Sequence, residues 1–206
     1  MVVDGWCLVD DKLVIHLMVD LKEIARYMRM GRTVPEGALA ERVTKLRDEA
    51  LTVIRPMQTW RRFPISNAAI ASGDIRLEIC GTLARHLAGC HAAYLVCGTI
   101  GAGFDTFQRR ISVTSGADAL IVQAIGAALI EKLMDTMEDT IRAELHKGET
   151  LASRYSPGYG DFPLAAQHTL FALLDAPRQV GVSLTDTLLM VPSKSVSAII
   201  GVKKEN

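Results

Sequence analysis

Apolar side chains recur at helical spacing in two long stretches of the chain. The first stretch, residues 33–54, has a proline in its first turn and another proline just beyond its end, as helices commonly do. The second stretch is longer and runs to about residue 146 behind a capping Thr114 or Ser115. Its predicted buried stripe is Leu120, Ile121, Ala124, Ala128, Leu133, Met137 and Ile141. The pattern therefore predicts two amphipathic helices that each bury one face.

Shorter segments of both periodicities separate these two helices. Further helices are predicted over residues 20–28, 83–87, 104–111 and 163–174. Strands are predicted over residues 2–19, 60–65, 75–79, 92–97, 180–184, 188–191 and 195–202. Because helices and strands mix without a regular β-α-β order, the sequence favours an α+β fold over a doubly wound sheet. We expect one domain over residues 1–206.

Composition and charge exclude several classes of protein. Of the 206 residues, 49% are apolar, which is enough for a buried core. The 23 basic and 23 acidic residues balance and form no basic stripe, so a nucleic-acid partner is not expected. Charged residues interrupt the most apolar stretch, residues 117–134, and the N-terminus carries aspartates in place of a basic start. We therefore expect a cytoplasmic protein without a signal peptide or a membrane span.

The four cysteines, Cys7, Cys80, Cys90 and Cys97, form no C-x-x-C pair. His86 lies four residues before Cys90, so a metal site there is conceivable, but the remaining ligand spacing of a zinc site is missing. We interpret the cysteines as reduced, buried thiols and predict no metal.

The run R-Y-S-P-G-Y-G-D-F-P over residues 154–163 is the most informative segment of the chain. Its two prolines and two glycines are unsuited to the interior of a helix or of a central strand, so we predict a loop of defined shape. Arg154 offers a planar fork to a carboxylate, and Tyr155 and Tyr159 offer rings for stacking or for a cation. Such a loop is typical of a ligand site, and a zwitterionic, ring-bearing ligand would use all of these groups.

The long predicted helix also carries an acidic face. Glu131, Asp135 and Glu138 share one side of it at helical spacing and could meet a cation. The alternative, which we take as the default, is a solvated face balanced by Lys132 and Arg142. Glu131 is the exception, because it borders the apolar stripe.

A glycine-rich turn, Gly98-x-x-Gly101-x-Gly103, joins a predicted strand to a predicted helix. It departs from the dinucleotide-binding pattern G-x-G-x-x-G and lacks the Lys-Ser/Thr pair of a phosphate-binding loop. We interpret it as a tight connection that could still line a pocket.

Serines and a lysine gather at the start of the last predicted strand. Ser195 and Ser197 share one face of that strand if it is regular. Together with Lys194 they allow a Ser/Lys nucleophile in principle, but the patterns S-x-x-K and G-x-S-x-G are both missing. We prefer the interpretation that these hydroxyl groups hold a polar ligand.

Taken together, the loop and the final strand resemble the activation (reactivation) domain of cobalamin-dependent methionine synthase, in its free-standing short form. The family's signature joins R-x-x-P-G-Y to a segment of the form M-x-P-x-x-S-V-S, which occur here as R-Y-S-P-G-Y and M-V-P-S-K-S-V-S. The similarity covers residues 71–202, and residues 1–70 match poorly. The resemblance implies a C-shaped α+β domain with a twisted antiparallel sheet and flanking helices.

The resemblance also implies a ligand, S-adenosylmethionine, and its contacts. Arg154 would meet the ligand's carboxylate, Gly158 and Tyr159 would contact its adenosyl part, and Glu131 matches an acidic helix residue that touches the ligand. Serine hydroxyls at the start of the final strand complete the match. The implied S-adenosylmethionine site is Arg154, Tyr155, Pro157, Gly158, Tyr159, Glu131, Ser195 and Ser197.

As a function, the resemblance implies an accessory protein for the reductive remethylation, or reactivation, of a cobalamin-dependent methionine synthase or a related corrinoid methyltransferase. A partner, either a corrinoid-binding protein or a truncated methionine synthase, would supply cobalamin, and a flavodoxin-like donor would supply the electron. Without cobalamin, homocysteine and folate modules, the chain would not be a complete methyltransferase. The alternative is a non-catalytic module that binds a ligand or a corrinoid protein and regulates it.

Overall fold

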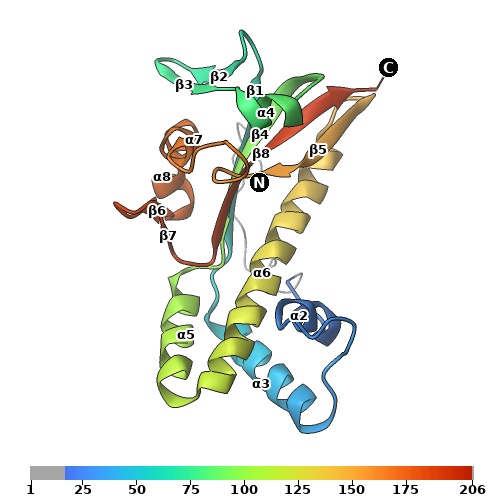
Figure 1. Cartoon of the computed structure of the whole chain (residues 1–206), viewed down its shortest axis with the longest axis vertical. Coiled ribbons are helices and arrows are strands. Elements are labelled where there is room, and N and C mark those ends of the chain that lie inside the picture. Colours follow the sequence, from blue (N-terminus) through green and yellow to red (C-terminus); the bar gives the residue numbers. More distant parts are fainter. Residues whose placement is uncertain (1–16, 206) are drawn as a thin grey trace.

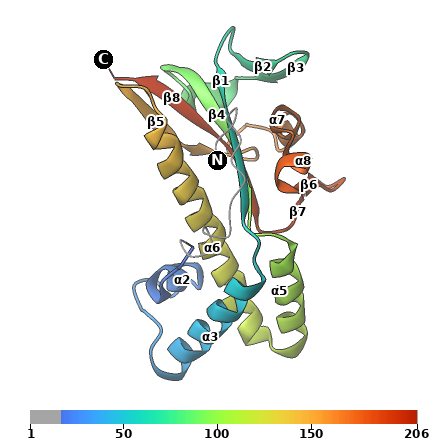
Figure 2. The same ribbon diagram turned by 180° about the vertical axis from the view of Figure 1, so that it is seen from behind.

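The computed structural model describes residues 17–205, which form an elongated molecule with a four-stranded sheet at one end and a group of helices at the other (Figure 1). The longest helix, α6 (Gly116–Ala143), runs between the two ends, as the view from behind also shows (Figure 2). Buried side chains of its first half join the helical core, and those of its second half join the core of the sheet.

Four antiparallel strands form the main sheet in the order β1-β4-β8-β5. Their bounds are β1 (Met57–Pro64), β4 (Cys90–Thr99), β8 (Ser195–Lys204) and β5 (Glu149–Tyr155). One row across the sheet pairs Arg62 with Tyr94, Tyr94 with Ile200, and Ile200 with Arg154. Directly paired residues point to the same side, so one face of the sheet carries an arginine at each edge.

Alternate residues of each strand enter two different hydrophobic cores. Trp60, Ile200 and others face α6 and pack against Met134 and Met137. Leu95 and the remaining alternate positions lie under α7 (Ala166–Leu174) and α8 (Ala176–Val180). Figure 1 shows α6 on one side of the sheet and these two helices on the other.

The opposite end of the molecule is built from α2 (Leu21–Tyr27), α3 (Gly37–Val53) and α5 (Ala102–Thr114) around the first half of α6. Two predicted caps are confirmed there. The Asp20 side chain accepts a hydrogen bond from the Glu23 amide at 2.7 Å, and the Ser115 hydroxyl accepts one from the Asp118 amide at 3.2 Å.

Smaller elements decorate the sheet end. A hairpin of β2 (Ala69–Ser72) and β3 (Ile75–Glu78) precedes the short helix α4 (Gly81–His86). A second, minimal hairpin of β6 (Ser183–Leu184) and β7 (Met190–Val191) follows α8. Among the described helices, none combines the length and the apolarity that a membrane span requires.

The glycine-rich turn is a tight strand-to-helix connection, as predicted. Gly101 has a positive φ of 88°, and a Cβ there would lie 2.8 Å from the Arg55 carbonyl oxygen. A Cβ on Gly103 would overlap the carbonyl oxygen of Val53. Glycine is therefore required because the backbone that follows α3 passes directly against this turn.

The α+β class and the twisted antiparallel sheet with flanking helices are confirmed, but several details differ. Residues 154 and 155 end strand β5 and are not part of a loop, because the prolines and glycines of the run begin only at residue 157, beyond the end of the strand. Helix α8 was not predicted, because Pro177 can indicate either the first turn of a helix or the end of one. Leu120, assigned to the buried stripe, is 73% exposed near the start of α6.

The N-terminal prediction lies mostly outside the described residues. Of the strand expected over residues 2–19, only residues 17–19 are described, and they form an irregular segment. Leu17 and Val19 are nevertheless buried in the helical core, so burial and not pairing explains their apolar character.

Candidate functional site

Arg154 ends strand β5 on the face of the sheet that α6 covers, and it contacts three carboxylates of that helix. Its Nη2 donates to Glu131 Oε2 at 2.9 Å and to Asp135 Oδ1 at 3.0 Å, and its Nε lies 3.2 Å from Glu138 Oε1. The guanidinium is largely covered, with 21% of the side chain exposed. Its Nη1 finds no hydrogen-bond partner within residues 17–205. Arg154 therefore has one N–H donor group that no described residue accepts from.

The acidic face of α6 is therefore an ion-pair network, where the sequence suggested a solvated face for all but Glu131. Glu138 is only 13% exposed and also pairs with Arg142 at 2.9 Å. Arg142 contacts Asp139 as well, at 2.7 Å. We call this network the ionic stripe: Glu131, Asp135, Glu138, Asp139, Arg142 and Arg154. Four carboxylates against two guanidinium groups leave it with excess negative charge.

The loop over residues 156–163 follows Arg154 and Tyr155 directly and closes on itself. Gly158 has a φ of 96°, a region that only glycine adopts without strain, and its amide donates to the Phe162 carbonyl oxygen at 2.8 Å. The Phe162 amide returns a bond to the Tyr159 carbonyl oxygen at 3.0 Å. Pro157 is buried beneath the turn, whereas the Tyr159 ring is 64% exposed. The loop thus presents one ring to solvent.

Four aromatic rings from α4, β5 and the loop lie together, and we call them the aromatic ladder: His86, Tyr155, Tyr159 and Phe162. His86 of α4 stacks on Tyr155 with ring centroids 4.6 Å apart, and Phe162 lies 6.2 Å beyond Tyr155. Tyr159 lies 6.0 Å from Tyr155 in a tilted arrangement. These rings form an apolar platform on the face of β5 opposite to the ionic stripe, because Tyr155 and Arg154 are consecutive residues of the strand.

The structure does not bring the two serines to Arg154. Arg154 pairs with Ile200, while Ser195 and Ser197 occupy alternate positions that face α7. Five residues of strand separate Ser195 from the Arg154 row, a span of about 16 Å. Ser197 shares the face of Tyr155 instead. It is 2% exposed, and its hydroxyl has no partner in the described part of the chain.

A Ser/Lys nucleophile is not assembled at the start of β8. The Ser195 hydroxyl donates to the Pro192 carbonyl oxygen at 2.7 Å and lies 2.9 Å from the Thr99 hydroxyl. Lys194 Nζ reaches the Gln123 carbonyl oxygen at 3.4 Å, and burial lowers the pKa of this lysine. These contacts tie the strand to its neighbours and do not join the amine to a hydroxyl.

The sequence predicted that all the cysteines are buried, but those that the structure describes are not all buried. Cys97 is buried, and its burial raises the pKa of the thiol to about 12. Cys90 is half-buried and Cys80 is exposed, while Cys7 lies outside the described residues. Between residues 17 and 205, no three His, Cys, Asp or Glu side chains are grouped so that they could hold a metal ion.

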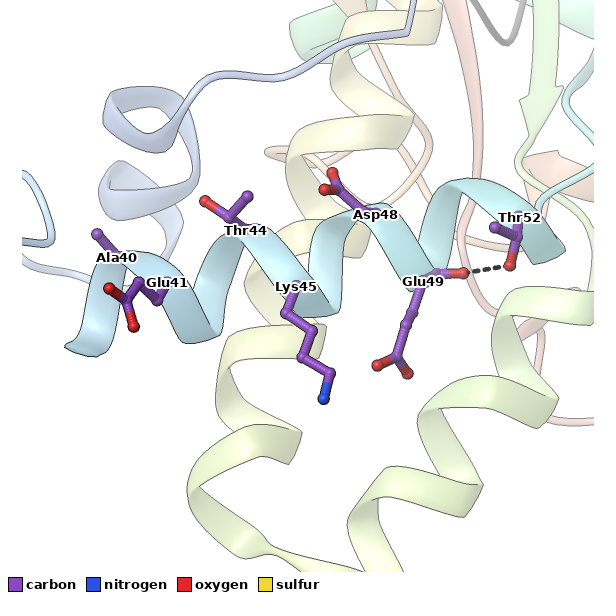
Figure 3. Close-up of a pocket in the computed structure, with 7 residues that line it drawn as sticks. All are labelled: Ala40, Glu41, Thr44, Lys45, Asp48, Glu49 and Thr52. Atoms are coloured by element: carbon purple, nitrogen blue, oxygen red, sulfur yellow. Dashed lines mark hydrogen bonds between the residues drawn. The ribbon is translucent and has the colours of Figure 1, made fainter. Parts of the chain in front are cut away.

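Five surface hollows formed by residues 17–205 are lined by residues other than Arg154, Tyr155 and Tyr159. Figure 3 shows one along the outer face of α3, where Thr52 donates to the Glu49 carbonyl oxygen at 2.7 Å. All seven lining side chains come from this single helix, so no second element supplies an opposing wall.

The sequence placed Glu131, Asp135 and Glu138 on one face of the long helix, at a spacing of one and two helical turns, but did not predict that Arg154 pairs with them. His86 and Thr82 of α4 gave no local signal, since they contact Ser153 and Asp161, which are 67 and 79 residues away in the chain.

Comparisons with known proteins agree on one family. The sequence model of the family described as "Vitamin B12 dependent methionine synthase, activation domain" matches residues 95–206, more than half of the chain. Among solved structures, "Crystal Structure of the MetH Reactivation Domain bound to AdoHcy" superposes with a TM-score of 0.62. The two chains share 16% sequence identity, over 95% of this chain and 77% of the other, so this likeness concerns the fold. No curated protein matches.

Proposed function

Since the chain belongs to the activation-domain family of vitamin B12-dependent methionine synthases, we propose that it binds S-adenosylmethionine and assists reductive remethylation of a partner's cobalamin. The partner would be a cobalamin-dependent methionine synthase or a related corrinoid protein. A flavodoxin-like donor would supply the electron and S-adenosylmethionine the methyl group. The task of this chain is then to hold the sulfonium methyl in line with the partner's cobalt.

The observation that carries the proposal is the pairing of Arg154 with Glu131 beside the Gly158 turn. An amino-acid head group carries a carboxylate and an ammonium, and this site offers both opposite charges within 3.0 Å of each other. Arg154 Nη1 is buried and without a partner among residues 17–205, so a small movement of the groups that cover it would let it donate to the carboxylate. Glu131 and Asp135 can accept from the ammonium.

Charge and shape beyond the head group also favour this ligand. S-adenosylmethionine carries a net positive charge because of its sulfonium, and the ionic stripe carries excess negative charge. The exposed Tyr159 ring offers a face for the sulfonium or the adenine. The similar solved structure is titled as bound to AdoHcy, which shares the adenosyl and amino-acid parts but lacks the charge.

Calorimetric titration with S-adenosylmethionine tests the proposal. We expect binding by the wild type and loss of binding in Arg154→Ala. Arg142→Ala is the matched control, because Arg142 also pairs with Glu138 but is 51% exposed and lies one step further along the stripe. Thermal unfolding of each variant shows whether the fold is intact, and Arg154→Lys keeps the charge if Arg154→Ala does not fold.

The outcomes separate the two candidate roles. Binding that is weaker for S-adenosylhomocysteine than for S-adenosylmethionine supports a site tuned to the sulfonium. If Arg154→Ala binds S-adenosylmethionine as tightly as Arg142→Ala and the wild type do, Arg154 is not part of the binding site. Absence of heat at millimolar S-adenosylmethionine would overturn the proposal and leave a non-catalytic module that binds a corrinoid protein or another ligand.

A further inference from the structure

We infer that α4 is a positioning element for the loop over residues 156–163, and that a contact between Thr82 and Asp161 sets the shape in which the loop binds its ligand. This inference rests on the proposed function, because the loop is the proposed S-adenosylmethionine site. Helix α4 lies outside the residues 95–206 that match the family model, so the match assigns it no role.

The contact is a compact set of hydrogen bonds. One carboxylate oxygen of Asp161, Oδ1, accepts from the Thr82 amide at 2.7 Å and from the Thr82 hydroxyl at 2.5 Å. The Asp161 amide in turn lies 3.3 Å from the Thr82 hydroxyl. The first two bonds, that from the Thr82 hydroxyl foremost, lower the pKa of Asp161. The carboxylate therefore stays ionised and binds the first turn of α4.

Glycines on both sides let the two backbones approach closely. A Cβ on Gly81 would lie 2.5 Å from the Asp161 carboxylate oxygens, and a Cβ on Gly160 would lie 2.7 Å from the Thr82 hydroxyl. Both glycines have a positive φ, of 55° and 56°. Any other residue at either position would push the loop away from α4.

The far end of α4 holds the other side of the loop. His86 Nε2 lies 2.8 Å from the Ser153 carbonyl oxygen, and because a carbonyl oxygen only accepts, Nε2 carries the hydrogen. The His86 ring stacks on Tyr155, whose hydroxyl donates to the Tyr159 carbonyl oxygen at 3.3 Å. Helix α4 thus contacts the chain on both sides of Tyr159, at Ser153 and Tyr155 before it and at Asp161 after it.

These contacts suit a positioning role better than a role in global stability. Asp161 is exposed, and Leu83 alone of the residues of α4 is buried in the core. Exposed hydrogen bonds contribute little to the free energy of unfolding, because water replaces them when they break. The same bonds remove conformations of the loop that could not bind, which strengthens binding by pre-organisation.

The test measures S-adenosylmethionine affinity and thermal stability in parallel. In Thr82→Val we expect the Kd to rise by about tenfold because the loop is no longer pre-organised. Thr82→Ser should restore the wild-type Kd, since it keeps the hydroxyl. Thr44→Val, on the outer face of α3, is the matched control and should leave the Kd unchanged. The melting temperature should stay within a few degrees in all three.

A double-mutant cycle identifies the contact itself. Asp161→Ala should raise the Kd as Thr82→Val does, and the double variant should be no weaker than either single variant. In the free protein, amides of the loop should exchange with deuterium faster in Thr82→Val than in wild type.

The two proposals fail in different ways. Wild-type binding that Thr82→Val leaves intact overturns the role of α4 and spares the proposed function. A raised Kd that only follows a large fall in melting temperature shows a structural role and also overturns it. If the wild type binds no S-adenosylmethionine, the proposed function falls, and the inference falls with it.

Discussion

Arg62 and Arg154 stand at the two edges of one row of the sheet and face the same helix, yet their ion pairs are built differently. Arg62 donates twice to Glu149, from Nη1 at 2.9 Å and from Nη2 at 2.6 Å. Glu149 is 4% exposed and also contacts His91 Nε2 at 2.9 Å and the His146 amide at 3.0 Å. Both oxygens of this carboxylate are fully used.

The groups of the Arg154 network are not all used in this way. Its guanidinium is shared among carboxylates that are 13% to 59% exposed, and its Nη1 stays without a partner among the residues described. A saturated pair stabilises one fixed geometry, whereas the exposed acceptors around Arg154 remain accessible to the donor groups of a ligand. The same residue type in the same row therefore closes an ion pair at one edge and, under the proposed function, contributes to a ligand site at the other.

Removing each arginine in turn gives the largest contrast. Arg62→Met should lower the free energy of unfolding by about 3 kcal/mol, because it leaves a buried carboxylate without its main partner. Arg154→Met should lower it by less than about 1 kcal/mol, because solvent reaches the carboxylates around it. Urea unfolding measures both. Equal losses would contradict the distinction between the two edges.

Acid should weaken the Arg62 edge selectively. Hydrogen bonds from Arg62, above all, lower the pKa of Glu149 from 4.5 to about 2. A depressed carboxyl pKa stabilises the fold above the unfolded value of 4.5 and loses this effect as pH falls towards 2. With screening by the solvent next to His146 and Lys147, we expect wild type to exceed Glu149→Gln by about 2 kcal/mol at neutral pH.

The measurement is urea unfolding of wild type and Glu149→Gln between neutral pH and pH 2.5. The two stabilities should converge as the pH falls below about 4.5, because the variant has no carboxyl group to protonate at this position. A constant difference across the range would place the stabilising charge elsewhere.

Gly158→Val probes the open edge through its loop. A β-branched residue at a φ of 96° is strained by about 1–2 kcal/mol, which the loop relieves by changing shape. We expect S-adenosylmethionine affinity to fall about tenfold or more while the melting temperature changes little, since Gly158 itself is exposed and a Cβ there would meet only Leu164. Gly148→Val, at a φ of 79° in the turn before β5, is a control with similar strain away from the loop. Unchanged affinity in Gly158→Val would mean that ligand binding does not depend on this turn.

Tyr159→Ala should have the smallest effect. The exposed ring contributes to a ligand by stacking, so we expect a loss of about 1 kcal/mol in binding and almost none in stability. Calorimetry and thermal unfolding of the same sample check both. A substantial drop in melting temperature would show that the ring supports the aromatic ladder more than it serves a ligand.

Local signals predicted most of the fold. The caps at Asp20 and Ser115, the length of α6 and the buried strands β4 and β8 followed from periodicity and end residues. Strand β5 was not predicted, because its burial is intermediate along nearly its whole length and its sequence therefore shows no alternation of apolar and polar residues. Register across four strands cannot be derived from one strand's pattern.

Local composition singled out candidate site residues, but it did not place them relative to one another. Arg154 and Tyr159 sit in a composition unusual enough to single them out, and Glu131 does contact Arg154. Ser195 and Ser197 were grouped with Arg154 by their motif, but the pairing of Arg154 with Ile200 turns them to the opposite face. The face of a strand that a residue occupies depends on pairing with neighbours that are distant in sequence.

Helix α6 is one uninterrupted rod of 28 residues, about 42 Å long, with its first half in the helical core and its second half under the sheet. The carboxylates that face Arg154 therefore stand on the same continuous helix that packs against α2, α3 and α5 at the far end of the molecule.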